Sequence, residues 1–163
     1  MTQRRLPADA DQATVASYYL TGIATGLFAF DCAKNWAFSV IDALDAPPVE
    51  VIEIATARDR DAVMEALRAM PGDANEEDAG RWLLAHIHDR LASARLTPIE
   101  AVEVAQRVVQ SMGLPGDIGI QLMLLDDALE LAIHGTFGSV QDISRDVLAV
   151  LADHSRGAIS PST

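Results

Sequence analysis

Hydrophobic side chains recur at helical spacing along most of the chain. In residues 59–70, Val63, Met64, Leu67 and Met70 fall on one side of a helix. Similar stripes predict helices over residues 11–26, 28–44, 79–94, 98–112, 118–134 and 139–151. The segment 118–134 is apolar around more than one face, which is typical of a central helix. We therefore expect this helix to be buried in the middle of the fold.

Helix start signals support these ranges. Residues 97–100 (TPIE) combine a capping threonine, a proline at the first helical position and a glutamate at the third. Ser139 followed by Asp142 predicts the start of the last helix. Asp73 followed by Glu76 resembles a second capping box. The start signals thus predict where three helices of the second half begin.

One segment is ambiguous between helix and strand. Residues 49–54 are rich in β-branched side chains, which favours a strand. No second strand is visible for it to pair with, and an isolated strand is not stable. We therefore predict a short helix here.

The predicted fold is all-α: a compact single-domain bundle of six or seven helices with roughly orthogonal packing. The domain is expected to span residues 11–154, between flexible tails at 1–10 and 155–163. A chain of 163 residues is long enough to bury a substantial core in one domain.

Two features of the first 44 residues indicate close packing. Six of the eight aromatic residues lie between residues 18 and 38, and we expect them to form the aromatic centre of the core. They are Tyr18, Tyr19, Phe28, Phe30, Trp36 and Phe38. Gly22 and Gly26 share one face of their helix, which favours close helix packing followed by a helix break. A homodimeric scaffold that packs through this glycine face is an alternative.

Composition and charge narrow the function classes. Half of the residues are hydrophobic and the net charge is −12, which excludes a disordered chain or a disulfide scaffold and disfavours nucleic-acid binding. The apolar stretch at residues 18–30 has 13 residues, fewer than the roughly 20 that a membrane helix needs. Cys32 is the single cysteine, so no disulfide can form within the chain. We expect a cytoplasmic bacterial protein that binds neither nucleic acid nor membrane.

Candidate chemistry is sparse. His86 and His88 are two residues apart and therefore point to opposite sides of a helix. Asp126, Glu130 and His134 are spaced four apart and form one stripe on the most apolar helix. This stripe predicts either a metal- or ligand-binding site or the one solvent-facing strip of that helix. No catalytic or dinucleotide motif is present, so we expect no cofactor and no enzymatic activity.

The distribution of charge points to a binding function. Residues 45–163 carry twenty acidic and nine basic side chains. An acidic surface attracts basic proteins and accelerates their association at low salt. We predict a non-enzymatic protein that binds and inhibits a basic partner, in the manner of immunity proteins that neutralise bacterial nuclease toxins. The expected contact residues are Asp73, Glu76, Glu77 and Asp78, with Asp126, Asp127 and Glu130 as a second patch.

Overall fold

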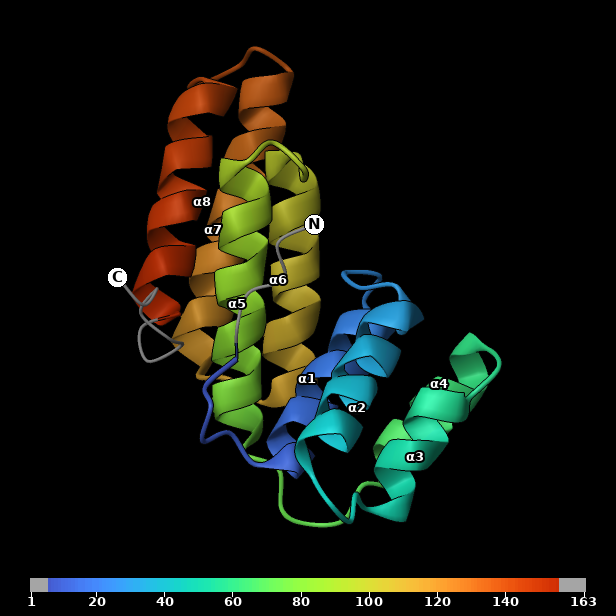
Figure 1. Cartoon of the computed structure of the whole chain (residues 1–163). Helices are drawn as coiled ribbons and strands as arrows, with labels where there is room; N and C mark the ends of the chain where they lie inside the picture. Colours follow the sequence, from blue (N-terminus) through green and yellow to red (C-terminus); the bar gives the residue numbers. More distant parts are fainter. Residues whose placement is uncertain (1–5, 156–163) are drawn as a thin grey trace. The chain divides into compact units, whose positions relative to one another are not determined.

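Residues 6–155 are described by a computed structural model, and within that range the chain forms eight α-helices and no strand (Figure 1). The all-α prediction is confirmed. The predicted number of six or seven helices is too low, because every periodic segment, including the short one after Pro48, forms a separate helix. None of these helices combines the length and apolarity needed to cross a bilayer.

The described chain divides into two compact units. Residues 9–76 form the N-terminal unit, which contains the first four helices. These are α1 (Gln12–Ala24), α2 (Phe30–Ala43), α3 (Val49–Thr56) and α4 (Arg60–Arg68). Residues 77–155, together with 6–8, form the C-terminal unit. Its helices are α5 (Glu76–Ala92), α6 (Pro98–Met112), α7 (Gly116–Ile133) and α8 (Val140–His154).

The domain boundaries remain a prediction. The range expected as one domain, residues 11–154, contains most of both compact units. Residues 6–11 precede α1 without helical structure, and Ser155 caps the C-terminus of α8. The rest of the two predicted tails, residues 1–5 and 156–163, lies outside the described residues.

Four aromatic rings form the centre of the N-terminal unit. The ring of Tyr18 lies 5.0 Å from that of Phe28, and Tyr19 stacks on Trp36 at 5.7 Å. Such ring pairs add to the stabilisation that burial provides. Phe38 departs from the predicted aromatic core, because half of its surface is exposed.

Gly22 has a packing role inside this unit. The amide of Phe28 donates a hydrogen bond to the Gly22 carbonyl, which folds the chain back so that the ring of Phe28 covers Gly22. Gly26 follows the end of α1 with a φ of +78°, which favours glycine and ends the helix. The predicted helix break is confirmed. The group that packs on Gly22 is the side chain of Phe28, from the turn after α1, and not a second helix as expected.

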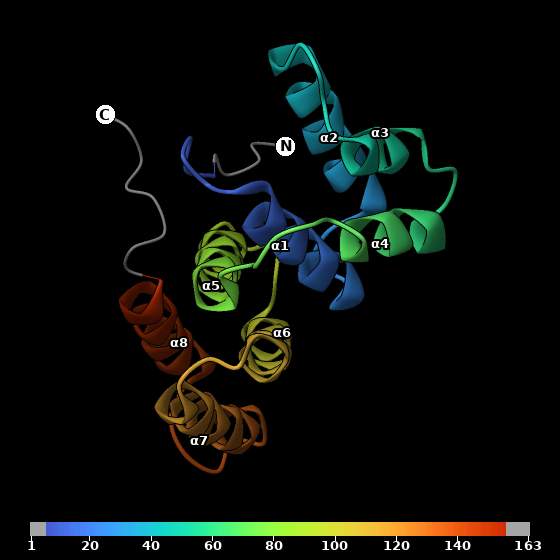
Figure 2. The same ribbon diagram turned by 90° about the horizontal axis from the view of Figure 1, so that it is seen from below.

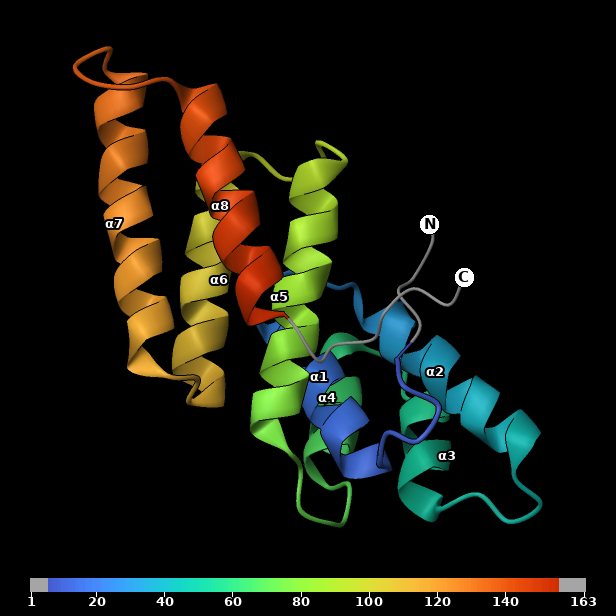
Figure 3. The same cartoon turned by 90° about the vertical axis from the view of Figure 1, so that its left-hand side faces the viewer.

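The C-terminal unit places α7 at its edge. In Figures 2 and 3, α7 lies beside α6 and α8, the two helices it contacts. Only Ile118, Leu122 and Leu129 of this helix are buried. The prediction of a central α7 is therefore wrong, because its neighbours cover one side of the helix only. Roughly orthogonal packing is not confirmed, since α6, α7 and α8 run alongside one another in Figure 3.

The capping box at the start of α6 is confirmed. The Thr97 hydroxyl accepts a hydrogen bond from the Glu100 amide at 3.2 Å, and the Glu100 carboxylate accepts one from the Thr97 amide at 2.8 Å. Both bonds satisfy amides that a helix start leaves without a partner. At the other end, Gly113 adopts the left-handed conformation (φ +60°) expected of a helix C-terminus.

Removing the capping hydroxyl should destabilise the C-terminal unit. We expect Thr97→Ala to lower the free energy of unfolding by about 1 kcal/mol, the usual loss for an N-cap. Urea denaturation followed by circular dichroism measures the change. Ser111→Ala, at an exposed position near the other end of α6, is the matched control and should leave stability unchanged or slightly higher. An equal loss in both variants would show that the capping box contributes nothing.

Candidate functional site

The first predicted acidic patch lies where the two units meet in the sequence. Asp73, Glu76, Glu77 and Asp78 are all exposed. α5 begins at Glu76 itself, so the expected capping box is wrong: Glu76 is not the third helical residue. Three carboxylates instead occupy the first turn of α5, where the helix dipole favours negative charge. Arg81 donates two hydrogen bonds to Glu77, at 2.7 and 3.1 Å, so part of this charge is compensated.

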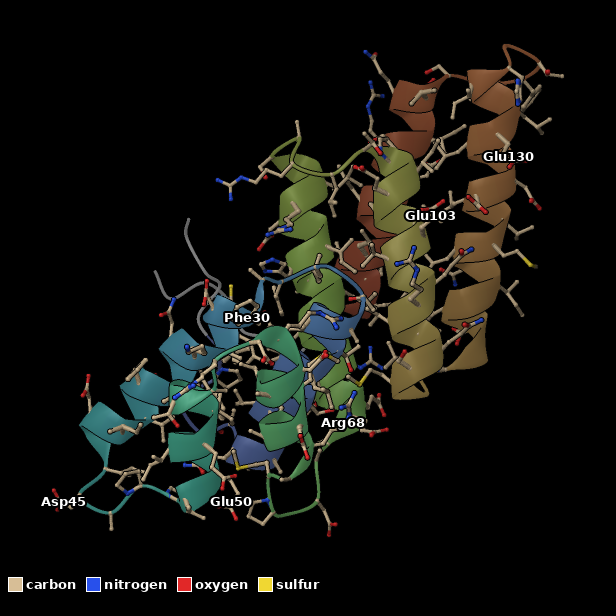
Figure 4. The ribbon with its side chains drawn as sticks, turned by 90° about the vertical axis from the view of Figure 1, so that its right-hand side faces the viewer. Phe30, Asp45, Glu50, Arg68, Glu103 and Glu130 are labelled. Carbon is tan, nitrogen blue, oxygen red and sulfur yellow. The ribbon has the colours of Figure 1, made fainter. Side chains whose placement is uncertain are left out.

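A shallow hollow of about 380 Å³ adjoins this patch within the N-terminal unit. Asp73 and Glu76 line it together with Arg68, which Figure 4 labels at the end of α4. The other lining residues are uncharged. They are Ala13, Ser17 and Leu20 of α1 together with Leu67, Met70, Gly72 and Ala74. The hollow thus presents both signs of charge to one small volume.

The second predicted patch lies on α7. Asp127 and Glu130 are exposed, and Asp126 is half-buried. Figure 4 shows Glu130 on α7 and the exposed carboxylate Glu103 on the neighbouring α6. α7 contains no lysine or arginine, so no cation of its own helix neutralises these carboxylates. The structure therefore places all three predicted residues on one helix.

The stripe of Asp126, Glu130 and His134 faces largely outward. Glu130 and His134 are exposed, and the His134 amide donates a hydrogen bond to the Glu130 carbonyl at 3.1 Å as α7 ends. His134 thus lies at the negative end of the helix dipole. Over residues 6–155, no three histidine, cysteine, aspartate or glutamate side chains are grouped so that they could hold a metal ion.

The remaining ionisable candidates are not members of either patch. His86 is buried, and His88 lies 3.3 Å from the Asp89 carboxylate. Burial raises the pKa of Tyr19 above its usual range, and the nearby Cys32 thiol adds to this effect. Because the phenol stays neutral and its ring packs on other rings, Tyr19 acts as a core residue.

The N-cap of α1 holds a carboxylate by local hydrogen bonds. The Thr14 hydroxyl and amide both donate to Asp11, at 2.7 and 2.9 Å. These bonds lower the pKa of Asp11, chiefly through the hydroxyl. They belong to helix capping, so the charge at Asp11 has a structural explanation.

The sequence interpretation missed an exposed apolar face on α7. Ile120, Met123, Leu124 and Leu131 each expose between 46% and 61% of their surface. Their spacing places them on the side opposite the buried Ile118, Leu122 and Leu129. The signal was present as all-round hydrophobicity, which is compatible with a central helix or with an edge helix that has a free apolar face.

Comparison with known proteins identified no relative of this chain. No family model, curated protein or solved structure matches the chain. Function is therefore inferred from the surface itself.

Proposed function

We propose that this chain is a non-enzymatic binding module that acts in the cytoplasm on a basic protein partner. It inhibits the partner by covering a cationic active-site cleft, as an immunity protein covers a nuclease toxin. The observation that carries this proposal is the acidic surface of α7: Asp117, Asp127 and Glu130 are exposed, Asp126 is half-buried, and the helix has no lysine or arginine of its own.

The charge of both units supports the same partner class. Residues 9–76 contain twelve acidic and four basic side chains, and residues 77–155 contain twelve and five. In the C-terminal unit, Arg145 lies 3.3 Å from Asp142 and Arg81 lies 2.7 Å from Glu77, so two of the five cations are already paired. A surface with this excess of negative charge attracts a basic protein over distances of about a Debye length, roughly 8–10 Å at moderate salt.

The proposal predicts recovery of a basic protein from a lysate of the source organism at low ionic strength and its loss at high ionic strength. Replacing Asp126, Asp127 and Glu130 by Asn, Asn and Gln should abolish recovery, because the partner then meets no α7 carboxylate at the centre of the patch. The recovered protein is identified, and its activity is measured with and without a stoichiometric amount of the chain.

A matched control removes the same amount of charge from the other unit. Figure 4 shows Asp45 in the turn after α2 and Glu50 on α3, and Glu53 lies further along α3. We replace the three residues by Asn, Gln and Gln. This variant should still recover and inhibit the partner. If no basic protein is recovered at either ionic strength, the proposal fails. Equal losses in the two variants would show that net charge alone acts, which contradicts a site on α7.

A further inference from the structure

We infer that the outer stripe of α7 is a docking face for a basic amphipathic helix of the partner. The outer stripe consists of Ile120, Met123, Leu124, Asp127 and Leu131. This inference rests on the proposed function and adds to it the secondary structure and the pattern of side chains that the partner presents.

Exposure of the outer stripe is unusual for aliphatic side chains. Leu124 exposes 61% of its surface and Ile120 exposes 57%, whereas Leu122 and Leu129 on the opposite side expose none. α6 and α8 pack against α7, and all the buried residues of α7 lie on that opposite side. A contiguous apolar face of this kind typically marks an interaction site. Because no helix of residues 6–155 buries this face, a partner that packed on it would gain the free energy of burying its apolar side chains.

The spacing of the outer stripe suits a helical partner. Its members stand at i, i+3, i+4, i+7 and i+11, which is the pattern of anchors in a helix-to-helix contact. At 1.5 Å per residue, the stripe is about 17 Å long, or three turns. An amphipathic helix of similar length can pack its own i, i+3 and i+4 side chains between those of α7.

The apolar surface continues past the C-terminal end of α7. Phe137 exposes 78% of its surface in the turn that follows. Its amide donates a hydrogen bond to the Leu131 carbonyl at 3.4 Å, which holds the backbone of Phe137 close to the end of the outer stripe. An exposed aromatic ring is a strong anchor for a protein partner.

The charges of α7 favour a basic partner over a second copy of the chain. Asp127 stands at the i+7 position, near the middle of the apolar residues, and α7 carries only negative charges. A second copy docked about a two-fold axis at the centre of the stripe would bring two Asp127 carboxylates together and would add four α7 carboxylates to four others. Like charges in contact are unfavourable, and an anionic lipid surface is repelled for the same reason. A helix with apolar anchors and flanking arginine or lysine complements both properties of the stripe.

The test uses three synthetic 18-residue peptides. The first has leucine at i, i+3, i+4, i+7 and i+11 with arginine and lysine at the other positions. The second has the same composition in an order without an apolar face. The third keeps the leucines and replaces the basic residues by glutamate. Binding to the full chain is measured by isothermal titration calorimetry. We expect the first peptide to bind and the other two to bind at least about tenfold more weakly.

Variants of the chain locate the binding site. Leu124→Ser with Leu131→Ser should weaken binding of the first peptide about tenfold or more, because two apolar contacts are lost. Phe38→Ser with Val49→Ser is the matched control, since it alters two exposed apolar residues of the N-terminal unit and should leave the dissociation constant unchanged. Asp127→Lys should weaken binding of the basic amphipathic peptide and strengthen binding of the acidic one. Thermal unfolding shows that each variant is folded.

The outcomes separate this inference from the proposed function. If the scrambled basic peptide binds as well as the amphipathic one, binding is purely electrostatic: the inference fails and the proposed function stands. If no peptide binds while the lysate experiment still recovers a partner, the inferred docking face is wrong and the proposed function stands. A dimer in sedimentation that Leu124→Ser with Leu131→Ser converts to a monomer would assign the stripe to a second copy and overturn the inference.

Discussion

Leu129→Ala should lower the free energy of unfolding by about 3 kcal/mol, within the range of 2–5 kcal/mol for removing a buried leucine. Leu129 is completely buried on the side of α7 that packs on α6 and α8. The substitution removes transfer free energy and leaves a cavity that the neighbouring helices fill only in part. The measurement is the urea midpoint and slope of the unfolding transition.

The control for this prediction lies on the same helix. Leu131 exposes 46% of its surface, two residues further along α7. Leu131→Ala should change stability by less than about 1 kcal/mol, because the side chain makes fewer contacts and alanine is a good helix former. Comparable losses at both positions would mean that α7 is covered on both sides, which would also remove the basis for a free docking face.

Gly22→Ala should destabilise the N-terminal unit by about 1–3 kcal/mol, the usual penalty for overpacking. A Cβ added at Gly22 would overlap the ring of Phe28, which cannot rotate out of the way without leaving its contacts with Tyr18 and Tyr19. The loss should be larger for Gly22→Val. Thermal and urea unfolding give the change in stability, and Phe28→Leu combined with Gly22→Ala should recover part of it.

The same substitution at another helical glycine should have the opposite sign. Gly119 lies in α7, and a Cβ there would meet only Val109 Cγ1 at an ordinary contact distance of 3.7 Å. Gly119→Ala should raise stability by up to about 1 kcal/mol, because alanine loses less backbone entropy than glycine in a helix. A destabilisation at both glycines would show that the ring of Phe28 is not the cause at Gly22.

Local signals predicted the helices and most of their ends. The capping box at Thr97 and the Ser139 cap, which accepts a hydrogen bond from the Asp142 amide, are both present. The short helix after Pro48 is also confirmed, as α3. Each of these features depends on residues within about one turn of one another, so a sequence pattern contains the information that forms it.

The candidate site was predicted in part. The carboxylates of α7 could be identified because charged side chains belong on the surface wherever the helix packs. The exposed apolar residues of the outer stripe could not be identified, because a helical pattern does not distinguish an exposed leucine from a buried one. Asp73 and Glu76 were predicted as part of one patch with Glu77 and Asp78, and the structure assigns the two pairs to different units.

The sequence by itself determined an acidic all-helical protein, since helix formation, capping and net charge follow from neighbouring residues and from composition. Only the tertiary structure decided which side of α7 is covered and that Phe28 packs over Gly22. Burial depends on which distant segments arrive at a surface, and hydrophobic attraction has no direction that a local pattern could encode. For this reason α7, the most apolar helix of the second half, lies at an edge with one apolar face free.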